Sequence, residues 1–205
     1  MIIDMIRVIQ ENKQYLSDLD GAIGDGDHGI NMNKGFTLGL EALEAAPEKG
    51  LAESLQTLSR VLMSDIGGSM GPLYGTFFME MGMAAPGEVI DAAALGQMLK
   101  AGMEGVMDIG GAQPGDKTML DVLFPAVEEY HAELAVGGSM AGCARRMMEA
   151  GQAGFEATRD MVARVGRASR LGERSRGVLD AGAASCYLLL ETIANFVIRM
   201  EEGSI

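Results

Sequence analysis

The recurrence of apolar residues at helical spacing, between short breaks rich in glycine and proline, most constrains the fold of this chain. Within residues 2–18, Ile2, Ile6, Ile9 and Leu16 mark one face of an amphipathic helix. No segment shows the alternation typical of a strand. The same spacing predicts further helices over residues 29–45, 51–66, 73–84, 91–107, 118–134, 140–163 and 183–201. Such helices, joined mostly by short loops, predict an all-α fold with antiparallel neighbours around a common core.

The composition fits one globular domain spanning residues 1–205. A net charge of −13 argues against a nucleic acid or an anionic membrane as the main partner. No apolar run reaches the roughly 18 residues of a membrane-spanning helix, and the first residues lack the pattern of a signal peptide. Cys143 and Cys186 lie far apart without metal-type spacing, which indicates buried free thiols and a cytoplasmic location.

The glycine-rich breaks fall after every second predicted helix. They cover residues 19–29, 67–72, 110–117 and 165–182, and most residues with chemical potential lie in them. In an antiparallel array, alternate loops meet at the same end. The sequence therefore predicts a functional site at one end of the helical barrel or bundle.

The first of these loops places three carboxylates, Asp20, Asp25 and Asp27, within eight residues and between glycines. Glycine permits the tight turns that would aim all three at one point, and a hard cation such as Mg²⁺ prefers oxygen ligands. A Mg²⁺ site that holds a polyphosphate is one interpretation, and a solvated Asp/Gly turn is the other. An EF-hand is disfavoured, because its last loop position needs glutamate and falls here on Asn31 or Phe36.

The second loop, residues 67–71, precedes a predicted helix. Free amides at a helix N-terminus favour phosphate, and the Ser69 hydroxyl would add a donor. The loop lacks the lysine of a P-loop and follows a helix rather than a strand. Glycines also simply end helices, so this reading stays open beside the phosphate site.

The third and fourth loops carry positive charge. Lys117 offers a positive charge for a phosphate group. Asp116 would then either orient the lysine or cap the next helix. The alternative interpretation is a plain turn followed by a helix cap. Four arginines lie between residues 166 and 177 of an otherwise acidic chain. Guanidinium groups suit phosphate oxygens, although a solvated mobile loop has the same composition.

Four motifs together resemble the nucleotide-binding L subunit of dihydroxyacetone kinase. They are Ile-Gly-Asp-Gly-Asp-His-Gly-Ile-Asn-Met at 23–32, Gly-Pro-Leu-Tyr-Gly-Thr-Phe-Phe at 71–78, Pro-Gly-Asp-Lys-Thr-Met at 114–119, and Gly-Arg-Ala-Ser followed by Leu-Gly-Glu-Arg-Ser within 166–175. The resemblance extends over essentially the whole chain, in order and with similar spacing.

The resemblance implies an antiparallel eight-helix barrel with ADP or ATP across one end. It implies two Mg²⁺ ions on Asp20, Asp25 and Asp27. With the residue-based reading of the loops, the expected nucleotide contacts are His28, Asn31, Gly68, Ser69, Met70, Gly110, Lys117, Met119, Arg167, Asp180 and Gly182. Asp25, Asp27 and Arg167 are the expected catalytic residues.

In this family the sugar is bound covalently through a histidine of a separate K subunit or domain. In the phosphotransferase-linked form, a third, M-type subunit draws on phosphoenolpyruvate to rephosphorylate bound ADP. We therefore expect a K-type and an M-type partner, with a homodimer also open. Two departures, Met70 where serine is usual and Ala181 where proline is usual, put the substrate and the phosphoryl donor in doubt more than nucleotide binding.

Several alternatives remain at this stage. They are an ATP-dependent form, a tetrulose kinase component, the nucleotide domain of a fatty-acid kinase, a nucleotide-sensing subunit without turnover, and a structural bundle. His28 after Asp27 favours the dihydroxyacetone type over the fatty-acid type. Neither His28 nor His131, which is expected to be a surface or packing residue, is placed to anchor a sugar, so this chain alone should not phosphorylate dihydroxyacetone.

Overall fold

The computed structural model describes residues 1–47, 50–87 and 89–203, and all regular secondary structure in these ranges is helical. The α-helices are α1 (Ile2–Glu11), α2 (Lys13–Ile23), α3 (His28–Glu44), α4 (Leu51–Asp65), α5 (Met70–Ala84), α6 (Ala92–Gly110), α7 (Leu120–Ala135), α8 (Met140–Ala157) and α9 (Ala181–Glu201). Two 3₁₀ helices, η1 (Thr158–Asp160) and η2 (Ala168–Ser175), lie between α8 and α9.

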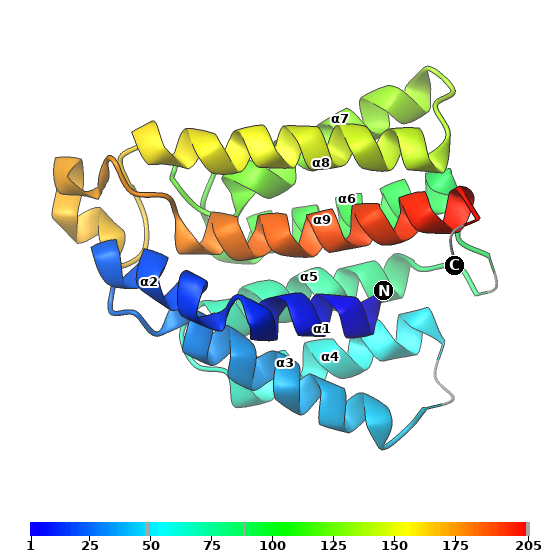
Figure 1. Cartoon of the computed structure of the whole chain (residues 1–205), viewed down its shortest axis with the longest axis horizontal. Coiled ribbons are helices and arrows are strands. Elements are labelled where there is room, and N and C mark those ends of the chain that lie inside the picture. The colour runs from blue at the N-terminus through cyan, green and yellow to red at the C-terminus, as the bar shows by residue number, and fades with distance from the viewer. Residues whose placement is uncertain (48–49, 88, 204–205) are drawn as a thin grey trace.

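The helices form a closed, antiparallel ring (Figure 1). Each helix from α3 onward packs against the next along the chain, and α9 packs against α1. Because α1 and α2 share one place between α9 and α3, the described α-helices fill eight positions. The predicted all-α antiparallel eight-helix barrel is therefore confirmed.

Several predicted helix boundaries were wrong. The helix α5 begins at Met70 rather than at residue 73, and α6 continues to Gly110 rather than ending at residue 107. The helix predicted over residues 2–18 breaks at Asn12, whose side-chain amide donates to Val8 O at 2.8 Å and competes with the helical hydrogen bonds. The second half, α2, continues through Asp20 to Ile23, so this aspartate lies in the last helical turn rather than in a loop.

The predicted helix at 140–163 ends at Ala157, because the chain tightens into η1 and then becomes extended at Met161. The Thr158 hydroxyl donates to Phe155 O at 2.7 Å at this point. The segment 165–182, predicted as loop, carries the 3₁₀ helix η2.

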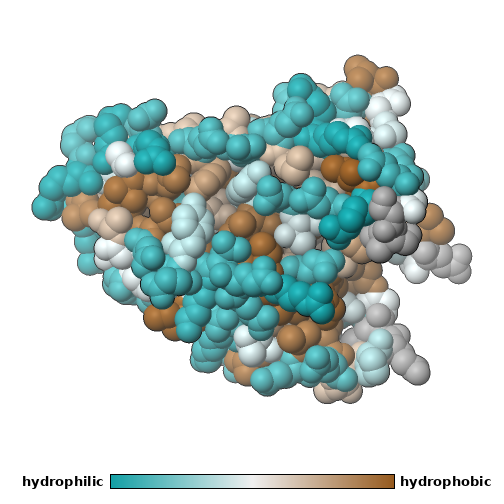
Figure 2. All heavy atoms as spheres, viewed as in Figure 1, coloured by the Kyte–Doolittle hydropathy of each residue, from teal (hydrophilic) through white to brown (hydrophobic). Residues whose placement is uncertain are grey.

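The interior of the ring is apolar, as the helical periodicity predicted. Phe36, Phe77 and Phe78 form an edge-to-face aromatic cluster in it. Leu40 of α3 and Leu51 of α4 are only partly buried and pack against this core. Cys143 and Cys186 are buried free thiols, as predicted. On the outside, hydrophilic residues cover much of the face seen in Figure 2.

Glycines allow close helix packing on the ring. Gly35 and Gly39 of α3 face side chains of α4, with Leu62 against Gly35 and Leu58 against Gly39. Backbone contact occurs instead at Gly154 of α8, which packs against the carbonyl of Asp121. That carbonyl lacks its usual helical donor, because the residue four positions on is Pro125.

Gly154→Ala should destabilise the fold by about 2–3 kcal/mol, because the added methyl group would collide with backbone that cannot move aside. Gly142→Ala in the same helix is the matched control, since its nearest contact would be an ordinary 3.5 Å. The control should be neutral or slightly stabilising. Urea unfolding of both variants tests this, and equal stabilities would contradict the packing argument.

The helix α9 is the only one in the described ranges that is long and apolar enough to cross a membrane. Its most apolar stretch is 56% buried inside the protein, where it packs between α8 and α1. A core helix of a barrel has the same length and composition, so these properties alone do not make α9 a membrane span.

The segments that join α2 to α3, α4 to α5, α6 to α7 and α8 to α9 all lie at one end of the barrel (Figure 1). These are the four glycine-rich loops, and their meeting at one end was predicted from the alternation of helices. The start of α1 and the end of α9 lie at the opposite end.

Candidate functional site

The four glycine-rich loops surround a cavity of about 300 Å³ at their end of the barrel. Its lining includes all of the predicted site residues except Asn31, which lies on α3 outside the lining. The volume is at the lower end of the range for small-molecule sites. The structure thus brings together residues from loops that are far apart in the sequence.

One wall of the cavity carries the three carboxylates. Asp20 comes from the last turn of α2, Asp25 from the connecting loop, and Asp27 from the residue before α3. One oxygen from each lies within 4.8 Å of the others. Gly26, with φ of 77°, provides a backbone conformation that suits glycine and turns the loop between them.

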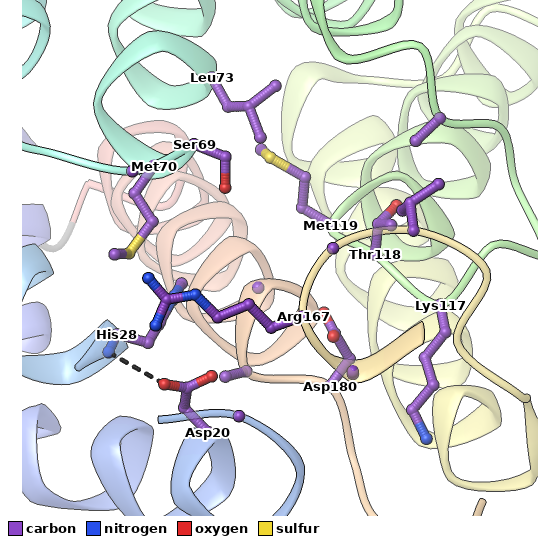
Figure 3. Close-up of a pocket in the computed structure, with 18 of the residues that line it drawn as sticks. Asp20, His28, Ser69, Met70, Leu73, Lys117, Thr118, Met119, Arg167 and Asp180 are labelled. Atoms are coloured by element: carbon purple, nitrogen blue, oxygen red, sulfur yellow. Dashed lines mark hydrogen bonds between the residues drawn. The ribbon is translucent and has the colours of Figure 1, made fainter. Parts of the chain in front are cut away.

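A positive charge already reaches this carboxylate cluster. Arg167, from the segment before η2, extends across the cavity (Figure 3). It forms an ion pair with Asp25. Both side chains are largely exposed, so the pair adds little stability. Converging oxygens that attract a guanidinium fit the ligand set of a divalent cation, which supports the predicted metal residues.

His28 begins α3 directly beside the carboxylates and is buried. Its backbone amide donates to Asp20 Oδ2 at 3.3 Å. Its Nε2 lies 2.8 Å from Ser185 Oγ, and that hydroxyl lies 2.7 Å from the hydroxyl of Tyr74. This hydrogen-bonded chain links α3, α5 and α9 below the cavity. Burial lowers the pKa of His28 to about 4, against the opposing effect of Asp20, so the ring is neutral at pH 7.

Acidification should therefore destabilise the metal-free protein through His28. The folded pKa is lower than the ordinary 6.5, so the folded state binds fewer protons and loses stability as pH falls from 6.5 towards 4. The loss from this one group should be on the order of 3 kcal/mol. Unfolding free energies in chelator at pH 7 and pH 4.5 should differ less for His28→Gln than for the wild type.

Asp180 has the opposite effect, so the comparison with His28→Gln is needed to isolate the histidine. Burial raises the pKa of Asp180 to about 6, although the hydrogen bond that its carboxylate accepts from the amide of Ala183 opposes this change. Its folded state binds more protons than the unfolded state below that pH, and stability from this group increases on acidification. An identical pH dependence in wild type and His28→Gln would contradict the assignment.

The N-terminus of α5 forms another wall. Gly68 has φ of 74°, and Ser69 precedes the helix without a side-chain cap on its first amides. Ser69 Oγ has no hydrogen-bond partner among the described residues, and its side chain lies across the cavity from Asp180 (Figure 3). Free helical amides and a free hydroxyl suit a phosphate group.

Lys117 takes a different place from the one expected of a phosphate partner. Its side chain points away from Ser69 and Met70 (Figure 3). Its Nζ donates to the carbonyls of Met161, Ser175 and Val178 at 3.3, 2.5 and 2.6 Å. Burial lowers its pKa, and Asp180 opposes that change.

Asp121, which sequence reasoning missed, rather than Asp116 shapes the turn that carries Lys117. Asp121 accepts the amides of Gly115 and Thr118 at 2.5 and 2.7 Å and so fixes the turn before α7. Asp116 instead accepts the amide of Gln113 at 2.8 Å, and it neither caps α7 nor hydrogen-bonds to Lys117.

Comparison with known proteins identifies the family. Residues 22–195, most of the chain, match the sequence profile of the DAK2 domain. The chain belongs to the DAK2 domain family. It is 42% identical over 185 residues to the ADP-binding subunit DhaL of phosphoenolpyruvate-dependent dihydroxyacetone kinase 1 from Listeria innocua, covering 90% of this chain and 88% of that one.

Two further relatives bear on the kind of kinase. The DhaL subunit of the phosphoenolpyruvate-dependent enzyme of Escherichia coli is 38% identical over 91% of this chain and 90% of its own. The D-erythrulose kinase of Mycolicibacterium smegmatis is 32% identical over 97% of this chain, which corresponds to 35% of that enzyme.

The DAK2 fold is also found in a solved structure. The dihydroxyacetone kinase of C. freundii, determined in complex with AMP-PNP and Mg²⁺, aligns with a TM-score of 0.70 and 24% identity. The alignment covers 95% of this chain and 33% of that one. At this identity the likeness concerns the fold.

Other residues of this DAK2 chain were missed because their partners are distant in sequence. Tyr74 and Ser185 are 111 residues apart, yet both hydroxyls support His28. Tyr74 was visible as part of the motif at 71–78, whereas Ser185 lies in a run of small residues and carries no signal.

Proposed function

We propose that this chain is the ADP/ATP-binding subunit of a dihydroxyacetone kinase. In this role it carries the phosphoryl group on Mg²⁺-bound nucleotide to dihydroxyacetone, or a related ketose, held on a separate K-type subunit. An M-type subunit that draws on phosphoenolpyruvate would restore the nucleotide. Identities of 38–42% across nine-tenths of two DhaL subunits support this proposal.

The observation that carries the proposal is the shared cavity of a carboxylate cluster and a helix N-terminus. A nucleoside diphosphate would use both features. A metal on the carboxylates would offset its negative charge, and the amides of the helix N-terminus would donate to its phosphate oxygens. Asp20, Asp25 and Asp27 would hold two Mg²⁺ ions. Bound Mg²⁺ would neutralise negative charge on the phosphates.

The chain's own residues would orient the nucleotide. The first amides of α5 with Ser69 would hold phosphate oxygens, and Arg167 would offset charge on the transferred group. Leu73, Val106 and Met119 provide apolar surface for the base. The remaining expected contacts are His28, Gly68, Met70, Gly110, Asp180 and Gly182, all on the cavity. Asn31 would need to turn towards the cavity to reach the nucleotide. The ammonium group of Lys117 is already bound to three backbone carbonyls.

The proposal covers residues 1–205 as one L-type domain in the cytoplasm. The K-type and M-type partners would dock in turn over the open end of the cavity, and a homodimer would have to leave that end free. The net charge of −13 argues against a nucleic acid or an anionic membrane as the main partner.

A component of a tetrulose kinase is the second candidate. The 32% identity to D-erythrulose kinase favours it, although that enzyme is almost three times as long as the matched region. In either case the ketose would be chosen by the K-type partner, so this chain should bind ADP equally well in both systems.

Calorimetry of the purified chain with ADP tests the proposal. We expect tight binding with Mg²⁺, weak binding with a chelator, and much weaker binding of adenosine, which lacks phosphates. Equal affinity for ADP and adenosine, or no effect of the chelator, would contradict it. Phosphoryl transfer with purified partners would separate an enzyme subunit from a nucleotide sensor.

A further inference from the structure

Lys117 has an unusual environment for a charged side chain. It is 2% exposed, and its ammonium group donates to three backbone carbonyls, of Met161, Ser175 and Val178. An ammonium group has three N–H donors. All of them are used in this arrangement, so none remains for a phosphate oxygen.

The three carbonyls belong to one segment, residues 161–178, which we call the arginine segment because it carries Arg167. One carbonyl precedes the arginine and two follow it. The ammonium group therefore draws the two ends of this segment together, on either side of the partly exposed residues 166–172.

Other hydrogen bonds also fix the base of the arginine segment, among them those from Gly177 N to Arg159 O at 2.7 Å and from Arg176 Nη1 to Asp160 O. Ala163 N donates to Ser175 Oγ at 2.9 Å, and that hydroxyl donates to Gly172 O at 2.6 Å. Arg164 N donates to Asp116 O at 3.1 Å. The segment has little apolar burial of its own, so its order depends on these polar bonds.

Lys117 is itself held in a fixed position. Its φ of 64° is uncommon for a residue other than glycine. Asp121 maintains this turn by accepting the amides of Gly115 and Thr118 on either side of it. A conformation that costs free energy and places one ammonium group among three carbonyls is consistent with a specific positioning role.

We propose that Lys117 is a positioning residue that fixes the arginine segment so that Arg167 reaches over the carboxylate cluster. It acts through the segment and does not contact the nucleotide. The consequence for nucleotide affinity rests on the proposed function, whereas the effect on the segment does not.

The first test is hydrogen exchange of the nucleotide-free protein. Lys117→Met, which keeps the length but removes the donors, should increase exchange across 161–178 by about tenfold or more. Lys100→Met, at an exposed lysine of α6, is the control and should leave this segment unchanged. Unchanged exchange in Lys117→Met would overturn the proposal, whether or not ADP binds.

The second test is a double-mutant cycle on ADP affinity with Mg²⁺. Lys117→Met and Arg167→Ala should each weaken binding by about tenfold, and the double variant should be no weaker than Arg167→Ala. Additive losses, about 100-fold together, would show that Lys117 acts independently of Arg167 and would overturn the proposal. Failure of the wild type to bind ADP would count against the proposed function alone.

The variant Lys117→Arg separates positioning from phosphate contact, and it also provides a test if Lys117→Met does not fold. Lys117→Arg keeps the charge but not the compact three-donor group, so it should not restore affinity, whereas a phosphate contact would tolerate it. If Lys117→Met does not fold, exchange across 161–178 is measured in Lys117→Arg, where it should also increase. Unchanged exchange and unchanged ADP affinity in Lys117→Arg would then overturn the proposal.

Discussion

Asp25→Asn should abolish tight, Mg²⁺-dependent binding of ADP. The variant keeps the shape of the side chain but removes one of the three negative charges that converge within 4.8 Å. A lost unit charge beside a divalent cation should weaken affinity by on the order of 100-fold, or about 3 kcal/mol. Calorimetry with ADP, with and without Mg²⁺, measures the effect.

Asp18→Asn is the matched control, because Asp18 lies on α2 with the same charge but is exposed and bonded to Gln14. Without Mg²⁺, Asp25→Asn should unfold at about the same temperature as the wild type, since lost repulsion among carboxylates offsets the lost ion pair with Arg167. Unchanged ADP affinity in a folded Asp25→Asn variant would exclude this aspartate as a metal ligand.

The isolated chain should not phosphorylate dihydroxyacetone with ATP and Mg²⁺. In the family the sugar is expected to be held by a histidine of the K-type partner, and neither histidine of this chain is free for that. The ring of His28 is buried against Ser185, and Nε2 of His131 bonds to Gly96 O at 3.1 Å. Product formation by this chain alone should be at background.

Addition of a K-type subunit and a phosphoryl donor should restore turnover. Asp25→Ala and Arg167→Ala should both be deficient in that reconstituted assay, because the first removes a metal ligand and the second a charge near the transferred group. Asp18→Asn should match the wild type. Multiple turnovers by the chain alone would mean that the site is complete without a partner.

The barrel could be predicted from sequence because its determinants are local. Apolar spacing fixes each helix, and alternation of up and down helices fixes which loops meet. The break at Asn12 could not be predicted, since asparagine is only mildly unfavourable in a helix and the competing side-chain bond is not visible in the sequence.

The candidate site was predictable where residues of the site are close in sequence, as with Asp20, Asp25 and Asp27. It was not predictable where long-range contacts decide the role. Lys117 had the charge of a phosphate partner, but the arginine segment, more than 40 residues away, supplies carbonyls that take its donors. The support of His28 by Tyr74 and Ser185 depends likewise on three helices meeting. The roles assigned to the site residues remain predictions.

The cavity lies at one end of the barrel, whereas the start of α1 and the end of α9 lie at the other end. This arrangement limits how a further domain could be joined to the barrel. The 21 residues of α9 span about 32 Å from the cavity end to the far end. A domain attached there would need a linker of about ten extended residues to return to the cavity of its own barrel. With a shorter linker it could reach only the cavity of another molecule. For the same reason, a barrel immobilised through either of those ends would present its cavity outward to an incoming subunit.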